Sequence, residues 1–484
     1  MLKFGTSGLR GLVTELTDRE CYLYTVAFLK YLLARKLIYK NSSVAIAGDL
    51  RPSSERILKA IAAAIRDYGF KIDYCGPIPT PTVFLYGFKR RLPSIMATGS
   101  HIPYDRNGIK FNLPNGEILK KNEQAITEYQ SKISANGELD SHFNKNGSFK
   151  KNPPRLPKIN IISEREYIKR YVNFFKKNFL RGKIIAVYQH SSVIRDLMVE
   201  ILKKLGARVI PVGRSQKFIP IDTEAIQAVD LKKARGWVKK YQADAVVSAD
   251  GDGDRPVLFD EAGNFIRGDF LGVICAAYLK ADSVSATASC NTGLEKSGKF
   301  KNINRTKIGS PYVIEAMQND KKNGYKKIVS YEANGGFLTG SDFKINGRKL
   351  SALPTRDSML PLLSALALAA ECQLTLSQLA QTFPQRFVYS QSIKGMPTEI
   401  SNHRLKKISG GNEMAKKQAK KIFNLPSEVI KFNFTDGARM FLANNEIVHI
   451  RPSGNAPELR VYSEASSKQR AKSLAERTLK KLGS

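Results

Sequence analysis

A strand–turn–helix pattern occurs three times along this chain, and it limits the possible folds more than any other feature. The repeats lie around residues 43–100, 183–250 and 284–332. In each, a short apolar run predicts a buried strand, and a turn and a helical segment follow. This alternation is typical of a mostly parallel sheet with helices on both faces. The repeats share architecture but not residue identity.

The last hundred residues follow a different pattern. Four short segments look like antiparallel strands joined by turns: Phe432–Gly437, Arg439–Leu442, Glu446–Ile450 and Glu458–Tyr462. A closing helix is expected from Ser467 to Leu482. Because 484 residues are too many for one hydrophobic core, the chain is expected to hold three or four domains. The first boundary is expected late in the polar stretch 117–158.

One strand of the first repeat ends in a turn that contains several polar and charged side chains. The apolar run 93–97 breaks into Gly, Ser, His and Pro, with Ser100 and His101 in the turn and Arg106 and Lys110 shortly after. A hydroxyl beside cations suits a phosphate carrier, because a covalent phosphate brings a charge of about −1.5 to −2. Alone, a Ser-His pair is more often a simple hydrogen-bonded turn.

A second strand, 244–249, ends in Asp250-Gly-Asp-Gly-Asp-Arg255. Three carboxylates at alternate positions can converge on one hard divalent cation. An EF-hand loop is the competing interpretation, but its sixth position requires Gly and is Arg255 here. The pattern therefore favours a Mg²⁺ site at the end of a strand.

Three further turns carry polar groups. The opening loop Gly5–Gly11 places Arg10 among glycines, and its spacing is not the dinucleotide fingerprint GxGxxG. Glu332–Gly336 combines a carboxylate and an amide in a glycine turn, which suits paired sugar hydroxyls. Arg451–Pro457 joins Arg, Ser and exposed glycine amides, a combination that can bind phosphate. Gly293–Lys299 nearly matches a P-loop, but Phe300 replaces the Ser or Thr that would bind Mg²⁺.

Composition bounds the class of protein. The net charge of +35 suits anionic ligands or nucleic acid, but the basic residues are spread along the chain and no aromatic-studded basic motif occurs. The five cysteines are scattered and lack CxxC spacing, which argues for a reducing compartment. The N-terminus has no apolar signal core, and the longest apolar run, 360–370, is too short to cross a bilayer. A cytoplasmic protein without membrane contact is expected.

Together, these motifs resemble the α-D-phosphohexomutase family, the phosphomannomutase/phosphoglucomutase enzymes. The similarity covers Gly5–Gly11, Thr98–Pro103, Asp250–Arg255, Glu332–Gly336 and Arg451–Asn455, which occur in the family's order and at its spacing. The resemblance implies three similar α/β domains with mixed, mostly parallel sheets and a C-terminal α+β domain around a central active-site cleft. The expected domains are 1–157, 158–262, 263–384 and 385–484.

The resemblance also implies roles for single residues. Ser100 would carry the phosphate, and Arg10, His101 and Lys110 would serve proton transfer and charge balance. Mg²⁺ would bind Ser100, Asp250, Asp252 and Asp254. Substrate would contact Arg255, Glu332, Asn334, Arg451, Ser453, Gly454 and Asn455. Asn334, Gly336 and Asn455 depart from the family's usual residues, and the first two leave the sugar preference open.

The implied reaction interconverts hexose 6-phosphate and hexose 1-phosphate through a 1,6-bisphosphate, which would also be the activator. Phosphomannomutase is favoured, with phosphoglucomutase or dual specificity as the alternative. Two other hypotheses remain: a nucleic-acid-binding protein with a degenerate site, which is disfavoured, and a phosphatase with the same nucleophile. A monomer or dimer acting on a small phosphosugar is expected.

Overall fold

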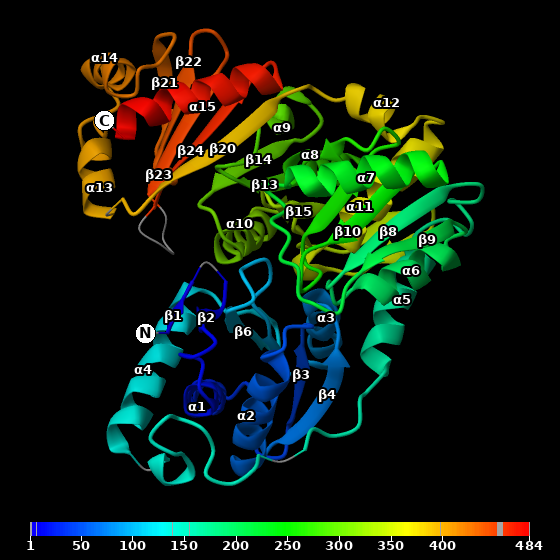
Figure 1. Ribbon diagram of the computed structural model, residues 1–484, viewed down its shortest axis with the longest axis vertical. Helices are drawn as coiled ribbons and strands as arrows, with labels where there is room; N and C mark the ends of the chain where they lie inside the picture. The colour runs from blue at the N-terminus through cyan, green and yellow to red at the C-terminus, as the bar shows by residue number, and fades with distance from the viewer. Residues whose placement is uncertain are drawn as a thin grey trace.

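The computed structural model describes residues 2–5, 7–137, 139–153, 155–396, 398–452 and 458–483. Three mixed sheets with helices follow one another along the chain, and an antiparallel sheet with helices ends it (Figure 1). This arrangement confirms the predicted fold class of three α/β units with mixed sheets and a C-terminal α+β unit. The mixed sheets are not mostly parallel, because among the described residues antiparallel pairings are at least as numerous as parallel ones in each. No helix of the described part of the chain has the length and apolarity needed to span a membrane.

The first sheet has the order β1-β2-β6-β5-β3-β4, and β7 pairs with β6. Its strands are β1 (Lys3–Phe4), β2 (Leu9–Leu12), β3 (Ser43–Gly48), β4 (Lys71–Pro77), β5 (Ser94–Ala97), β6 (Arg106–Leu113) and β7 (Gly116–Glu117). Its helices are α1 (Asp18–Ala34), α2 (Ser54–Asp67), α3 (Thr80–Arg90) and α4 (Lys120–Asn136), followed by the 3₁₀ turn Asp140–His142.

Alternating apolar residues explain why helices cover both faces of this sheet. On β3, Val44 and Ile46 pack into the core with α1 and α2, whereas Ala45 and Ala47 pack with Val83 of α3. Successive side chains of a strand point to opposite faces, so a fully apolar strand must be covered twice.

The second and third sheets repeat the same plan. The second has the order β12-β11-β10-β8-β9, and the third β14-β13-β15-β16-β19. In each, three parallel strands are extended by antiparallel ones. The second unit comprises α5 (Ile162–Phe174), β8 (Ile184–His190), α6 (Arg195–Lys204), β9 (Arg208–Arg214), α7 (Ala228–Tyr241), β10 (Ala245–Ala249), β11 (Pro256–Phe259) and β12 (Phe265–Ile266).

The third unit adds a two-stranded ribbon to its sheet. It comprises α8 (Gly268–Tyr278), β13 (Ser283–Thr287), α9 (Gly293–Lys296), β14 (Asn302–Thr306), α10 (Ser310–Lys322), β15 (Ile328–Tyr331), β16 (Phe337–Thr339), β17 (Phe343–Ile345), β18 (Arg348–Leu350), β19 (Leu353–Asp357), α11 (Met359–Glu371) and α12 (Leu376–Gln381). One continuous core joins α3 of the first unit to α5 and α6 of the second and α8 and α11 of the third. The three units are therefore packed against one another.

The C-terminal sheet is antiparallel throughout, in the order β20-β24-β23-β22-β21. Its elements are β20 (Phe387–Lys394), α13 (Thr398–Lys406), α14 (Glu413–Ile422), β21 (Val429–Asn433), β22 (Ala438–Leu442), β23 (Ile447–Pro452), β24 (Glu458–Ala465) and α15 (Lys468–Gly483). It has its own core. In Figure 1 this unit, orange to red, lies above the blue N-terminal unit.

Two elements differ from the sequence-based expectation. The polar stretch 117–158 contains the helix α4, which buries only a few residues, including Ile126 and Ile133, against the first core. An apolar stripe this sparse gives little periodic signal. The first expected C-terminal strand, 432–437, lies at 429–433, because Val429 is buried and the residues after Asn433 form the turn to β22.

Candidate active site

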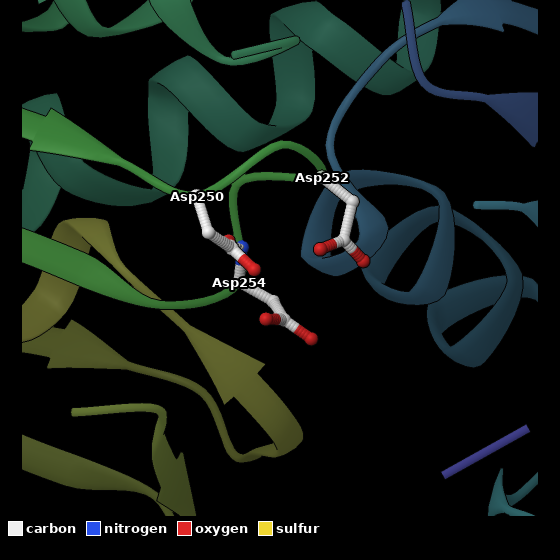
Figure 2. A group of neighbouring side chains, drawn as sticks. All are labelled: Asp250, Asp252 and Asp254. Atoms are coloured by element: carbon white, nitrogen blue, oxygen red, sulfur yellow. Dashed lines mark hydrogen bonds between the residues drawn. The ribbon is translucent and has the colours of Figure 1, made fainter. Parts of the chain in front are cut away.

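The acidic loop Asp250–Arg255 connects β10 to β11, two antiparallel neighbours. Gly253 has a φ of +71°, a left-handed conformation that glycine adopts without strain. The turn places one carboxylate oxygen from each of Asp250, Asp252 and Asp254 within 4.8 Å of the others. Figure 2 shows the three carboxylates pointing toward one shared space. The predicted convergence of the three acids is therefore present in the structure.

These residues fit a divalent metal ion. Oδ1 of Asp252 and Oδ1 of Asp254 are buried and have no hydrogen-bond partner. Buried carboxylate oxygens without partners are costly, and hard oxygen ligands are what Mg²⁺ prefers. Burial, reinforced by the charges of the other two acids, raises the pKa of Asp250 well above its usual value. A cation among the three acids would relieve this repulsion.

Neighbouring side chains hold the loop in shape. Thr80 Oγ1 donates to Asp252 Oδ2 over 2.5 Å, and Ser358 Oγ donates to the Gly253 carbonyl over 2.7 Å. These contacts come from the first and third units, so the acidic loop of the second unit is braced from both sides. The backbone N–H groups of Asp254 and Arg255 donate to Asp250 Oδ1, each over 3.2 Å.

Ser100 lies directly beside this cluster. Its Oγ donates to Asp250 Oδ2 over 2.6 Å, although the two residues are 150 positions apart. The strand β5 positions it, because the Ser100 turn begins where β5 ends and precedes β6. Ser100 is fully buried in the structure. The hydroxyl and the acid triad therefore form one site.

Two cations bind the acids on this side. Lys110, on β6, places Nζ 2.6 Å from Asp252 Oδ2 and 2.7 Å from Asp254 Oδ2. Burial pushes the pKa of Asp252 upward, but Lys110 and Thr80 more than offset it, and the pKa is lowered. Arg255 places Nε 3.5 Å from Asp254 Oδ1 and 3.8 Å from Asp250 Oδ2. Both cations therefore lie against the acid triad beside Ser100.

The imidazole of His101 is neutral in this site. Burial lowers its pKa well below the usual value, and the charges of Arg255 and Arg10 lower it further. Arg255 Nη1 lies 2.8 Å from Nδ1, and a guanidinium only donates, so Nδ1 accepts and the ring proton resides on Nε2. Arg10, on β2, donates through Nη1 to the Gly99 carbonyl. Burial lowers the pKa of Arg10 to about 10, which leaves it charged at neutral pH.

The turn after β15 brings Glu332 to the same region. Arg356, on β19, donates from Nη1 to Glu332 Oε1 and from Nε to Asp254 Oδ2, each over 3.0 Å. Asn334 Oδ1 accepts from the Gly336 N–H over 2.9 Å and thus shapes its own turn. Glu332 is therefore linked to the acid triad through one guanidinium.

Arg451 lies at the end of β23, and its Nε is 2.9 Å from Asp436 Oδ2 in an ion pair. The Asp436 carboxylate also accepts from the Ile308 N–H of the third unit over 2.9 Å. No contact joins Arg451 to Ser100 among the residues described. Ser453, Gly454 and Asn455, which were predicted to bind phosphate with it, lie outside the described residues.

A cavity of about 270 Å³ connects the Ser100 turn to the C-terminal unit. Its lining comprises His101, Asp222, Glu224, Ala225, Ser390, Gln391, Ser392, Glu458, Arg460 and Tyr462. These residues come from the first, second and C-terminal units. A ligand in this cavity would lie between His101 and the strands β20 and β24.

Sequence reasoning missed two buried arginines. Arg356 joins Asp254, Glu332 and Ser7, whose Oγ accepts from Nη2 over 3.0 Å. Arg51, in the turn after β3, contacts the carbonyls of the Ser100 turn. Neither arginine stands in a motif of the sequence, and only the folded chain brings them to the site.

Comparison with protein-family models covers nearly the whole chain. The phosphoglucomutase/phosphomannomutase models match α/β/α domain I at residues 1–137, domain II at 165–263, domain III at 267–387 and the C-terminal domain at 402–481. The chain belongs to the phosphoglucomutase/phosphomannomutase family. This membership confirms the resemblance found in the motifs.

Individual relatives agree with the family assignment. A phosphomannomutase of Salmonella muenchen is 42% identical over 485 residues, covering 100% of this chain and 96% of the relative. A phosphomannomutase of Sinorhizobium fredii is 41% identical, covering 100% and 99%. A solved family member from Burkholderia thailandensis superposes with a TM-score of 0.74 at 17% identity, covering 99% and 96% of the two chains. At that identity, the structural match supports the fold alone.

Proposed function

We propose that this member of the family is a phosphohexose mutase that interconverts hexose 6-phosphate and hexose 1-phosphate, with mannose as its preferred sugar. The observation that carries the proposal is the Ser100 hydroxyl, which lies 2.6 Å from an acid of a buried three-carboxylate cluster. The two relatives above 40% identity over the whole chain are both phosphomannomutases, which supports the choice of mannose.

In the proposed reaction, Ser100 Oγ carries a phosphoryl group. The P–O bond to Oγ breaks as a new P–O bond forms to a free hydroxyl of the hexose monophosphate. The hydroxyl loses a proton, and Oγ gains one. The resulting 1,6-bisphosphate reorients in the cavity so that its other phosphate faces Ser100. Oγ then bonds to that phosphorus and loses its proton, the bond from that phosphorus to the sugar oxygen breaks, the sugar oxygen gains a proton, and the hexose monophosphate product leaves. A hexose 1,6-bisphosphate would therefore also prime a dephosphorylated enzyme.

The chain's own groups supply most of what phosphoryl transfer needs, which is positioning and charge stabilisation. Lys110 and Arg255 stabilise the negative charge of the transferring group, and Arg10 fixes the carbonyl before Ser100. Asp250 Oδ2 accepts the hydroxyl hydrogen of Ser100. Mg²⁺, when bound by Asp250, Asp252, Asp254 and a Ser100 phosphate oxygen, would neutralise further charge on the phosphoryl group.

Substrate recognition is proposed to use two places. Glu332 would hold sugar hydroxyls, with Asn334 shaping its turn, and Arg451 would bind the phosphate that does not react. Ser453, Gly454 and Asn455 are proposed to complete that phosphate site. We also infer domains at 1–157, 158–262, 263–384 and 385–484, a cytoplasmic location, and a monomer or dimer.

A steady-state assay tests the function. Purified protein with Mg²⁺ and a hexose 1,6-bisphosphate is given mannose 1-phosphate or glucose 1-phosphate, and kcat/KM is measured for each. The proposal expects turnover of both, with the higher kcat/KM for mannose 1-phosphate. A higher value for glucose 1-phosphate would make the protein a phosphoglucomutase, and free phosphate released at the turnover rate would make it a phosphatase.

A further inference from the structure

The backbone at Ser100 adopts a conformation that a serine rarely occupies. Its φ is +55°, in the left-handed region where the Cβ of an L-residue crowds the following carbonyl. Such a residue persists only where its surroundings hold it there, and this kind of strain often occurs at functional sites. The residues that hold the Ser100 backbone in this conformation can therefore affect the reaction as well as the stability of the fold.

The N–H side of Ser100 is held by a short chain of side-chain bonds. The Ser100 N–H donates to Thr98 Oγ1 over 2.8 Å, and Thr98 Oγ1 donates to Asp49 Oδ2 over 2.7 Å. Asp49 Oδ1 in turn accepts from Ser54 Oγ over 2.6 Å. These residues follow β3 and β5, which are parallel neighbours in the sheet.

The carbonyl side is held by Arg51. Its Nη2 donates to the carbonyls of Ser100 over 2.9 Å and of Ile102 over 2.5 Å. Its Nη1 donates to the carbonyls of Pro103 over 2.7 Å and of Arg106 over 2.9 Å. One guanidinium thus donates to three carbonyls of the segment that joins β5 to β6 and to the carbonyl of Arg106, the first residue of β6.

These hydrogen bonds engage both terminal nitrogens of the guanidinium group. Nε makes no hydrogen bond, but it lies 3.3 Å from Asp49 Oδ2 in a buried ion pair. The Arg51 side chain is fully buried, so water does not compete for these groups. A lysine has three donors on one nitrogen and cannot bind all of these partners. The planar guanidinium, with donors on separate nitrogens, is therefore required for this set of contacts.

The surroundings leave the guanidinium no room to move. The ring of Phe218, from the second unit, lies 4.0 Å from Arg51 Cζ. A Cβ on Gly99 would lie 2.5 Å from the same Cζ, so the residue before Ser100 must be glycine for Arg51 to remain in place. A Cβ on Gly251, in the acidic loop, would lie 2.5 Å from the Ser100 carbonyl.

We propose that Arg51 is a positioning residue for the phosphoryl transfer, which keeps Ser100 in its left-handed conformation and so aims Oγ at the acid triad. The inference rests on the proposed mutase function. Arg51 itself touches neither Oγ nor the acids through any contact described here, and it acts through the backbone of the Ser100 turn. A positional error of about 1 Å at a reacting atom can cost roughly 10²-fold in rate.

The test uses Arg51→Lys, which keeps the charge and loses the fork, and Gly99→Ala, which displaces Arg51 without changing it. The matched control is Arg56→Lys. Arg56 also binds an aspartate and two backbone carbonyls within the first unit, but it contacts Asp18, Val13 and Leu16 rather than the Ser100 turn. The measured quantities are kcat, KM, the melting temperature and the rate at which labelled hexose bisphosphate phosphorylates Ser100.

We expect kcat and the Ser100 phosphorylation rate to fall roughly 10²-fold in Arg51→Lys and Gly99→Ala, with KM changed less than about threefold. Arg56→Lys should leave kcat within about twofold of the wild type and should lower the melting temperature less than Arg51→Lys, because the Arg56 side chain is 39% exposed. If kcat in Arg51→Lys stays within threefold of the wild type, or if it falls equally in Arg56→Lys, the inference is wrong.

A second measurement keeps the test independent of activity. Amide hydrogen exchange across residues 98–106 should be faster in Arg51→Lys than in the wild type and unchanged in Arg56→Lys. If amide hydrogen exchange across residues 98–106 is the same in Arg51→Lys as in the wild type, the inference that Arg51 holds the Ser100 turn is wrong. Absence of mutase activity in the wild-type protein would instead overturn the proposed function, so the two failures can be told apart.

Discussion

The buried carboxylate of Glu464, on β24, is one of the groups that link the C-terminal unit to the third unit. It is 3% exposed and accepts hydrogen bonds from the N–H and the hydroxyl of Thr292, across the boundary between the units. Within its own unit, it pairs with Arg386 Nε over 2.6 Å and Arg439 Nη2 over 3.4 Å. Because Arg451 is on the neighbouring strand β23, this link helps to set where Arg451 lies.

The substitution Glu464→Gln should loosen this link. It keeps the size of the side chain and one acceptor but removes the charge that two buried arginines face. Removing one partner of a buried ion pair costs about 3–5 kcal/mol, and hydrogen bonds to a charged group contribute about 1.5–3 kcal/mol. Since the amide oxygen still accepts, we expect a loss of about 2–4 kcal/mol in the stability of the C-terminal unit and its docking.

The assay combines urea unfolding, followed by fluorescence and by amide exchange in β23 and β24, with steady-state kinetics. We expect unfolding of the C-terminal unit at lower urea and a higher KM, with a smaller change in kcat. The control is Glu428→Gln, which removes an exposed ion pair with Lys420 in the same unit and should change stability by at most about 1 kcal/mol. Equal behaviour of Glu464→Gln, Glu428→Gln and the wild type would refute the reasoning.

Three more predictions follow from the site and its supports. Chelation of divalent cations should abolish activity, and readdition of Mg²⁺ should restore it. The variant Asp254→Asn should need a higher Mg²⁺ concentration for its half-maximal rate. A rate that does not change with chelator would contradict the metal assignment. Gly268→Ala should lower kcat/KM, because its Cβ would lie 2.4 Å from the Gly335 nitrogen and push the Glu332 turn, whereas Gly236→Ala, with open space, should not. Tyr171→Phe should lower the free energy of unfolding by about 1–3 kcal/mol in a denaturant titration, because it leaves the buried Asp357 carboxylate with Tyr167 as its one tyrosine donor. An unchanged unfolding midpoint would show that the Tyr171 hydroxyl does not stabilise the fold through Asp357.

The sequence was sufficient for the architecture where its signals are local. The strands β3, β10 and β15 are apolar runs, and each is followed directly by an acid: Asp49, Asp250 or Glu332. β10 lies within one residue of the expected strand 244–249. The acidic loop was recognisable because its three carboxylates lie at alternate positions of one short segment and a strand end brings them together.

Other parts of the site could not be predicted because they depend on long-range packing. Arg356 bridges Asp254 and Glu332 across 102 and 24 positions, and no local pattern marks it. Arg51 stands in an ordinary turn, and its role appears only when β3 and β5 become neighbours. The roles assigned to Glu332, Asn334 and Arg451 came from the family resemblance and stay predictions until they are tested.

The most direct test of the account is the site of phosphorylation. The protein is incubated with Mg²⁺ and a hexose 1,6-bisphosphate labelled in its phosphates, and peptides are mapped by mass spectrometry before and after hexose 6-phosphate is added. We expect label on Ser100 that is lost to the sugar at the rate of turnover, with neither label nor activity in Ser100→Ala. Turnover without label on Ser100, or an active Ser100→Ala variant, would contradict it.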